Sequence, residues 1–244
     1  MRLRRILPAV AVLPALLVIS ACSSDADGSD AKKAAPSAKG SQSAEEKESA
    51  EAERVGALDT KHLEKVALTG TVKGINAKKV AKAEVEAGRG MKADNKACQP
   101  LASLIGGFTH IPAVSEVHRS LQPVKATNAT VGSMWLASHS EKNATQVMKD
   151  LRAAVTACPK GFNTLGLKYG KVEKLPATKL GDESVDYRIT SDIGKQKVPM
   201  AYTVVRSDGV VAVFYGVNML DMKKASISTS FIQAQLDRIA GQTG

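Results

Sequence analysis

Hydrophobic spacing predicts a helix across the middle of the chain. Between residues 144 and 158, apolar side chains recur at three- and four-residue steps, which is the pattern of one buried helix face. Ser138 and Glu141 stand at capping-box spacing before this run, and Pro159 and Gly161 follow it. The spacing therefore predicts one long amphipathic helix that ends near residue 158.

Two further helices are expected on either side of this one. A short helix starts near Lys96 and ends at Gly106 and Gly107. A last helix over residues 228–240 carries an apolar stripe at three- and four-residue spacing, formed by Ile232, Leu236 and Ile239.

The second half of the chain changes to the two-residue period of strands. Asp208 and Gly209 separate two β-rich runs, and this pair is typical of a tight hairpin turn. The expected strands are 63–72, 131–137, 185–189, 198–205 and 210–217. Strands in hairpin order, with helices before and after them, predict an α+β fold with a largely antiparallel sheet packed with helices.

The N-terminal residues have the order of a bacterial secretion signal. Three arginines precede an apolar stretch over residues 6–18, and Ile19, Ser20, Ala21 and Cys22 then follow. This ending resembles the lipobox of bacterial lipoproteins, in which the cysteine thiol receives diacylglycerol before cleavage. We therefore expect residues 1–21 to be a signal peptide and Cys22 to become the lipidated N-terminus, held at the extracytoplasmic face of the cell membrane.

Two other readings of this segment remain open. It could be an ordinary cleaved signal with a cysteine at that place by chance, or an uncleaved transmembrane anchor. An anchor needs about 20 apolar residues, whereas this stretch is shorter and contains Pro8 and Pro14. Lipid anchoring is the reading that the sequence favours.

Residues 22–54 have the composition of a disordered tether. They contain no aromatic side chain and few branched apolar ones, so they cannot bury enough surface to offset the entropy of ordering. The stretch Ala44 to Arg54 has good helix formers but no apolar stripe that would dock it. Residues 55–244 remain for a single extracytoplasmic domain with one core.

Charge narrows the choice of partners. The formal net charge is +10, and the basic excess lies after residue 54. Outside the membrane, such a domain meets anionic phospholipid headgroups or acidic wall polymers rather than nucleic acid. The alternative is a solubilising surface, with residues such as Lys78, Lys79 and Lys82 on exposed faces.

The cysteines other than Cys22 are Cys98 and Cys158. An even pair in an oxidising compartment is most simply a disulfide, which would join the short helix to the long one. A shared metal is the weaker alternative because no histidine stands at ligand spacing from either cysteine.

No catalytic constellation is visible in the sequence, so we expect a protein that is not an enzyme and has no cofactor or metal site. The four histidines are scattered, and we expect them at the surface or at helix caps: His62, His110, His118 and His139. Asp182 and Glu183 are better explained as a turn before a strand than as an acid and base pair.

Weaker motifs have simple explanations as well. Gly88, Gly90 and Ala93 match a dinucleotide fingerprint only in spacing, since no buried strand leads into them. Met219 and Met222 have no third soft ligand nearby in the sequence, so we expect core or loop methionines.

One family resemblance covers most of the chain from Leu58 to Ile239. It lies in the run from Lys96 to Leu101, the helix that ends at Cys158, the segment Leu180 to Ser184, and the hairpin Val204 to Val210. These features resemble secreted actinobacterial lipoproteins whose domain is similar to the extracellular sensor domain of mycobacterial receptor serine/threonine kinases. The resemblance implies a central antiparallel sheet, a cleft, and ligand binding without catalysis, but it names no binding residue.

Three functions follow as expectations. The first is a membrane-anchored, monomeric, sensor-like module that binds a small molecule or an envelope component in a cleft between sheet and helices. The second is a carrier of lipid or glycolipid, which would need a cavity lined by aliphatic side chains. The third is an envelope hydrolase, which would need titratable groups that converge in a pocket. We favour the first.

Overall fold

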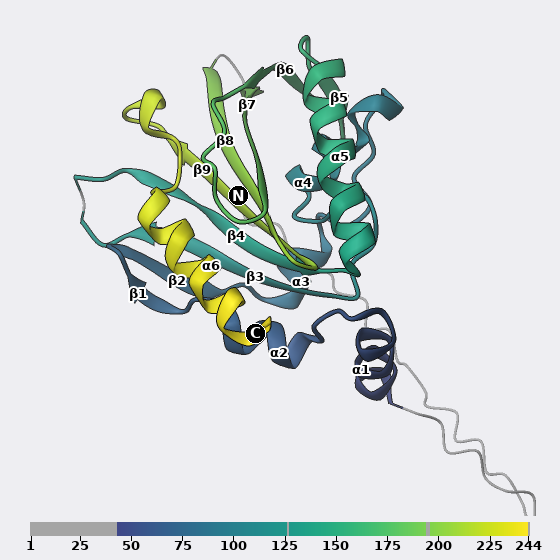
Figure 1. Cartoon of the computed structure of the whole chain (residues 1–244). Helices are drawn as coiled ribbons and strands as arrows, with labels where there is room; N and C mark the ends of the chain where they lie inside the picture. The colour runs from purple at the N-terminus through teal and green to yellow at the C-terminus, as the bar shows by residue number, and fades with distance from the viewer. Residues whose placement is uncertain (1–42, 126, 194–195, 244) are drawn as a thin grey trace, which may run out of the picture. The chain divides into compact units, whose positions relative to one another are not determined.

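Nine strands in the described part of the chain form one fully antiparallel sheet. The computed structural model describes residues 43–125, 127–193 and 196–243 (Figure 1). The strands follow the order β1-β2-β3-β4-β9-β8-β7-β6-β5 across the sheet. They are β1 (Gly70–Val72), β2 (Ile75–Lys79), β3 (Ser115–Pro123), β4 (Thr130–Ser138), β5 (Phe162–Thr164), β6 (Leu167–Lys174), β7 (Glu183–Ile193), β8 (Gln196–Ser207) and β9 (Val210–Asn218).

Helices cover both faces of this sheet, so the predicted α+β class with a largely antiparallel sheet is confirmed. They are α1 (Ala44–Val55), α2 (Thr60–Val66), α3 (Lys82–Glu86), α4 (Gln99–Ile105), α5 (Glu141–Ala157) and α6 (Thr229–Thr243), with 3-10 turns η1 (Lys96–Cys98) and η2 (Met222–Lys224). The described residues form one compact unit.

Each face of the sheet has its own hydrophobic core. On one face, α4 and α5 pack over strands from both halves of the sheet, with side chains such as Leu101 and Leu151 fully buried. On the other face, α2 and α6 pack over β2, β3, β4 and β9 through residues such as Leu63 and Phe231. Alternation along β4 sends Trp135 to the first core and its neighbours to the second.

Most predicted elements are confirmed. Strands are present where they were expected around Trp135 and on both sides of Asp208, which has a φ of +51° in the tight turn between β8 and β9. The last helix buries its predicted stripe against the second core.

Two predictions near the helices are wrong. Residues 63–72 were expected to form one strand, but Asp59 caps α2 by accepting from the His62 N–H, and only Gly70–Val72 is a strand. The cap of α5 is Ser140, which accepts from the Asn143 N–H, instead of Ser138. The Ser138 hydroxyl accepts from the Leu58 N–H at 2.7 Å.

The expected tether is also corrected where the structure describes it. Ser43 and Glu46 form a capping box at the start of α1, and Ala52 is buried. The helix docks through polar contacts, because the Thr60 N–H donates to Glu48 at 2.7 Å and Ser49 donates to Asp59. A composition without an apolar stripe does not reveal such contacts. Residues 1–42, including the predicted signal and Cys22, lie outside the described residues.

The predicted disulfide is confirmed. Cys98 in η1 and Cys158 at the end of α5 are bonded, with their Cα atoms 6.0 Å apart. Both side chains are buried in the first core. The bond therefore joins the two helices that pack over the same face of the sheet.

Candidate functional site

A cavity of about 450 Å³ opens on the face of the sheet that α4 and α5 cover. We call it the aromatic cleft. Its floor consists of side chains from five strands, and its wall consists of the end of α4 and residues from 80 to 91. The residues on the floor are His118, Ser133, Trp135, Tyr169, Met200, Tyr202 and Tyr215. Arg119 also lines the cavity, but its guanidinium binds Leu68 and Glu64 on the opposite face of the sheet.

Strand register stacks the aromatic rings of the floor. His118 is paired with Trp135 across β3 and β4, and their rings are 6.2 Å apart and inclined by 13°. Tyr202 on β8 is the cross-strand partner of both Tyr187 on β7 and Tyr215 on β9, with ring centroids about 5 Å apart on each side. Cross-strand aromatic pairs of this kind stabilise a sheet and hold each ring in a fixed orientation.

Two nitrogen atoms of this floor lack partners. Trp135 is 3% exposed, and neither its Nε1 nor Nε2 of His118 has a hydrogen-bond partner among the described residues. A buried polar group without a partner costs about 1 to 3 kcal/mol, so most such groups in proteins are satisfied. Both side chains belong to residues that line the aromatic cleft.

Both of these nitrogens belong to rings that are uncharged at neutral pH. Burial, together with the positive charges of Arg89 and Arg119, lowers the pKa of His118 to about 4. The ring is therefore uncharged at neutral pH, and its Nε2 can donate or accept according to the tautomer. The indole N–H of Trp135 can only donate, so it requires an acceptor atom on a ligand.

Charged groups lie beside the cleft. The Arg89 guanidinium lies 4.0 Å over the Phe108 ring, 2.6 Å from Glu86 and 3.3 Å from Glu116. Phe108 in turn packs against the His118 ring, with centroids 5.6 Å apart. Burial raises the pKa of Glu116 to about 7, although the nearby Arg89 opposes the shift.

The raised pKa of Glu116 predicts that the free energy of unfolding depends on pH, and that Glu116→Gln removes this dependence. The folded protein holds the Glu116 proton more tightly than the unfolded chain does. The contribution of Glu116 to the free energy of unfolding therefore falls as the pH rises from about 4.5 through 7. Between pH 5 and pH 8, the unfolding free energy of Glu116→Gln should rise by about 1 to 3 kcal/mol relative to wild type, at 1.36 kcal/mol per pKa unit. Urea unfolding at both pH values measures this difference.

Glu86→Gln is the matched control, because Glu86 binds the same arginine but has a lowered pKa. Its difference from wild type should stay constant over that range. His118 and His139, both with a pKa lowered to about 4, change the unfolding free energy only below about pH 6.5. They do so equally in all three proteins, so their contributions cancel when the variants are compared with wild type. An equal pH response of wild type and Glu116→Gln would contradict the shift.

The wall of the cleft is held by direct backbone contact. A Cβ atom at Gly88 would overlap the carbonyl oxygen of Gly106, and one at Gly106 would overlap that of Gly88. These two glycines therefore let the segment after α3 lie directly on the end of α4. Gly88 was notable in the sequence only as part of a weak dinucleotide motif, whereas its place here is structural.

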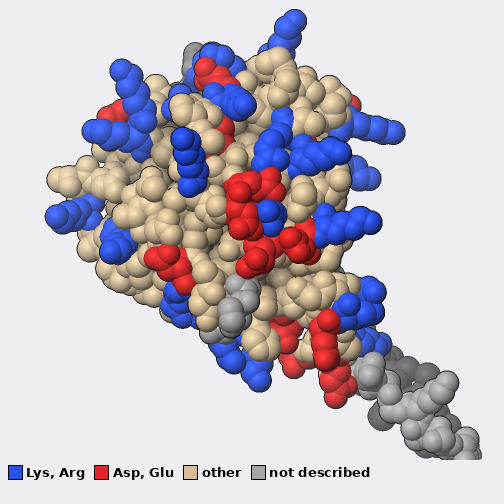
Figure 2. Space-filling view, in the orientation of Figure 1, with Lys and Arg blue, Asp and Glu red and all other residues tan. Residues whose placement is uncertain are grey.

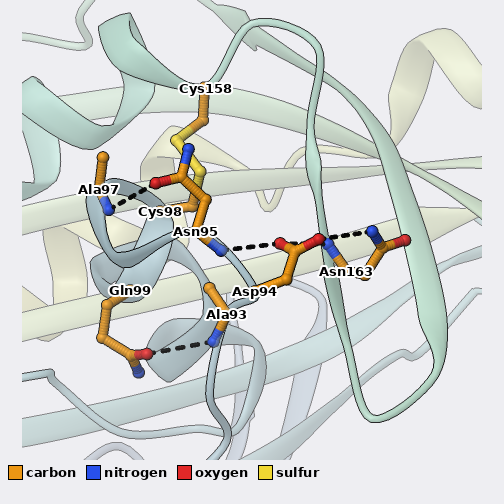
Figure 3. The surroundings of a disulfide bond; sticks show 8 residues. All are labelled: Ala93, Asp94, Asn95, Ala97, Cys98, Gln99, Cys158 and Asn163. Atoms are coloured by element: carbon orange, nitrogen blue, oxygen red, sulfur yellow. Dashed lines mark hydrogen bonds between the residues drawn. A yellow bond between two sulfur atoms is a disulfide. The ribbon is translucent and has the colours of Figure 1, made fainter.

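The disulfide region supports the same wall (Figure 3). Gln99, next to Cys98, accepts from the Ala93 N–H at 3.1 Å and donates to the Met91 carbonyl oxygen at 2.7 Å. Asp94 accepts from the backbone and side-chain N–H groups of Asn163 on β5. The loop that carries Met91 to the cleft is thus tied to α4 and to the edge of the sheet.

The histidines do not all lie at the surface or at caps. His62 is exposed beside Asp59, and His110 lies 2.9 Å from Asp150. His139, by contrast, is buried with its Nε2 atom 3.1 Å from the Thr109 hydroxyl, and His118 lies on the cleft floor. The prediction is wrong for these last two because strand pairing and the end of β4 turn them inward.

Asp182 and Glu183 form the predicted turn before a strand. Gly181 has a φ of +60° there, and β7 begins at Glu183. Arg206 lies 2.8 Å from Asp182 and 2.7 Å from Glu183, and Arg152 also pairs with Glu183. Both carboxylates therefore serve an ion-pair cluster instead of facing the aromatic cleft.

Other hollows lack this combination of features. Another, of about 510 Å³, lies beside the start of α6, and the side chains of Thr130 and Asn218 in it bond to each other. Within residues 43–125, 127–193 and 196–243, no three His, Cys, Asp or Glu side chains are grouped so that they could hold a metal ion.

Sequence reasoning did not find the aromatic cleft. Tyr187, Tyr202 and Tyr215 each lie on a predicted strand, and Trp135 lies on a fourth, so the rings themselves were visible. Their meeting depends on which strands pair and in what register, which the spacing does not show. A single aromatic residue near the middle of each of several strands is the signal that could have pointed to it.

Comparison with known proteins gives no relative for this chain: neither the protein-family models nor the curated proteins contain a match. None of the described helices is long and apolar enough to span a bilayer.

Proposed function

We propose that this chain is a membrane-anchored extracytoplasmic lipoprotein whose domain binds a small molecule in the aromatic cleft without transforming it. One observation carries the proposal. Trp135 and His118 both line a cavity of about 450 Å³, which is within the size range of small-molecule sites, and each has a ring nitrogen without a hydrogen-bond partner among the described residues.

The lining indicates the class of ligand. The aromatic rings of the floor favour a molecule with a flat or ring-shaped apolar face, because such faces pack on aromatic side chains. The Trp135 N–H requires an acceptor oxygen or nitrogen on that molecule. The ligand would therefore be a compact ring compound with at least one hydrogen-bond acceptor, of the kind found among envelope components and small metabolites.

The same lining separates this function from the alternatives. A carrier of lipid would need a continuous aliphatic surface, whereas this floor is aromatic and carries polar atoms. A hydrolase would need an acid and a base that meet at a reacting atom. His118 is the histidine that lines the cleft, and its ring is neutral. Within the described chain, no nucleophilic side chain forms a hydrogen bond with its Nε2 atom, so the pair that a hydrolase needs is not formed there.

Two parts of the proposal come from the sequence. Acylation of Cys22 would hold the domain at the outer face of the membrane, with residues 23–42 as the link to α1. The similarity to receptor-kinase sensor domains stays a prediction, and the antiparallel sheet beside a cleft agrees with what that similarity implies.

Native mass spectrometry of the protein extracted from its host membranes tests both parts. We expect a chain that begins at Cys22 with added acyl mass, together with a small non-covalent adduct. Trp135→Phe keeps a ring but removes the N–H, so the adduct should fall at least tenfold, as the loss of a buried hydrogen bond of about 1.5 kcal/mol requires.

Phe214→Leu is the control variant, because Phe214 is buried in the core on the opposite face of the sheet. It should weaken the fold while the adduct remains. An adduct of lipid mass would support the carrier instead. A wild-type protein without any adduct, or equal adducts in wild type and Trp135→Phe, would overturn the cleft as the site; a chain that retains Met1 would overturn the anchor.

A further inference from the structure

One end of the sheet displays several large apolar side chains to solvent. Five of them lie on the β3–β4 hairpin and on the loop after β9, and we call this group the apolar tip. Its members are Val124, Val131, Met219, Leu220 and Met222, each between 43% and 85% exposed. Isolated exposed apolar residues are ordinary, but a group at one end of a domain marks an interaction surface.

Hydrogen bonds show that these segments are neighbours. The Val124 N–H donates to the Gly74 carbonyl oxygen at 2.9 Å, which joins the β3–β4 turn to the β1–β2 turn. The Thr130 hydroxyl donates to the Lys224 carbonyl oxygen at 2.6 Å, which joins the start of β4 to η2. Met219 and Met222 lie beside Lys197, just after the β7–β8 turn.

The tip is a built feature of the fold. Asn218 is 3% exposed, and its Oδ1 accepts from the N–H groups of Leu220 and Asp221 while its Nδ2 donates to Thr130. Asp221 in turn accepts from the Lys223 N–H. The buried Asn218 amide thus orders the loop, yet the loop holds Leu220 at 85% exposure. At that exposure the Leu220 side chain contributes almost no burial of apolar surface to the stability of the fold.

Basic side chains surround the tip. They are Lys73, Lys125, Lys197, Lys223 and Lys224, all exposed. Asp221 pairs with Lys224 and Asp192 with Lys197, so the other three lysines stand outside the ion pairs of the described chain. Figure 2 shows basic side chains along the left margin, on the side where Figure 1 places the β3–β4 turn and the loop after β9.

We infer that the apolar tip inserts into the interface of an anionic lipid bilayer. Apolar side chains ringed by lysines fit the two layers of that interface, because the acyl boundary accepts Leu and Met while the headgroups attract the ammonium groups. Each lysine near an anionic surface contributes about a fivefold gain in affinity, and each buried Leu or Met contributes tenfold or more.

The chain before the domain makes such a contact possible. In Figure 1 the tip lies at the left and α1 at the lower right, so the point where the described chain begins is away from the tip. Residues 23–42 can span at most about 70 Å, whereas the 12 residues of β8 extend over about 40 Å. A domain anchored through Cys22 could therefore reach the same bilayer with its tip. This reach rests on the proposed anchor, whereas the tip's affinity for lipid does not.

Vesicle sedimentation tests the inference with unacylated protein. The chain from Ser23 to Gly244 contains every described element, both cores and the disulfide, and it lacks Cys22. We expect it to bind vesicles of phosphatidylglycerol and phosphatidylcholine, and to bind pure phosphatidylcholine vesicles at least tenfold more weakly. Leu220→Ser with Met222→Ser should reduce binding to the anionic vesicles at least tenfold, and Lys73→Glu with Lys223→Glu should do the same.

Matched controls lie away from the tip, two of them at the β5–β6 edge of the sheet, which β7 and β8 separate from β9. Leu165 and Leu167 are also more than half exposed, and Lys78 and Lys168 are exposed lysines away from the tip. Leu165→Ser with Leu167→Ser, and Lys78→Glu with Lys168→Glu, should bind as wild type does. Circular dichroism confirms that each variant is folded.

Three results would overturn the inference. They are an absence of wild-type binding to anionic vesicles, equal losses in tip and control variants, and binding that the lysines alone determine. The last result would show that the protein adsorbs to anionic headgroups by charge alone, without insertion of the apolar side chains. Because no acyl group is present, each of these results leaves the anchor and the aromatic cleft to their own test.

Discussion

Replacing Cys98 and Cys158 by alanine should lower the free energy of unfolding by about 4 kcal/mol. The bond joins residues 60 positions apart, so it removes a large part of the conformational freedom of the unfolded chain. Both sulfur atoms are also buried in the core under α4 and α5, and alanine leaves a small void there. Urea unfolding of the double variant and wild type, without reductant, measures the difference.

Reductant provides the control for this prediction. It should destabilise the wild-type protein toward the value of the double variant and leave the double variant unchanged. Equal unfolding free energies for oxidised wild type and Cys98→Ala with Cys158→Ala would show that the native contacts already confine the two helices. The adduct predicted for the aromatic cleft should weaken in parallel, since Gln99 beside Cys98 holds the Met91 loop.

Arg119→Met should cost about 3 kcal/mol, the second largest effect that we expect. The guanidinium is 1% exposed and binds three groups: the Leu68 carbonyl oxygen, the His118 carbonyl oxygen and the Glu64 carboxylate. Methionine fills much of the same volume but leaves these acceptors without their donor. Removal of one member of a buried ion pair usually costs 3 to 5 kcal/mol for this reason.

Lys79→Met gives the matched comparison, because Lys79 binds the same Glu64 carboxylate at 2.9 Å. Its side chain is 65% exposed, so the loss should be below about 1 kcal/mol. Thermal unfolding of both variants compares the contribution of a buried ion pair with that of an exposed one, both made to the same Glu64 carboxylate. Similar losses for Arg119→Met and Lys79→Met would contradict the assigned role of the buried guanidinium.

Local pattern predicted much of the fold. The three- and four-residue spacing in α5, the Asp208-Gly209 turn and the cysteine pair each depend on residues close in sequence or on one bond between buried side chains. The helix α1 was underestimated because it docks through Glu48 and Ser49, whose contacts with residues 59 and 60 have no hydrophobic signature. The segment that contains α2 was misassigned because its apolar residues also fit a strand.

The sequence predicted that a cleft is present but not which residues line it. A cleft between sheet and helices followed from the family resemblance, but its residues come from five strands and from a loop far away in the sequence. His118 illustrates the difficulty. Its place depends on register with Trp135, on Phe108 after α4, and on Arg89, which lies after α3. No spacing rule connects these positions.

The contact between Gly88 and Gly106 limits how the shape of the aromatic cleft can change. Because any side chain at either position would push the two segments apart, that wall has one permitted geometry. New shapes must instead arise from the strands, where every second residue faces the cavity and can be exchanged without moving the backbone. One wall of the cleft is therefore fixed while its floor can vary, so proteins that share this fold but have a cleft of another shape should differ at the ring positions and keep both glycines.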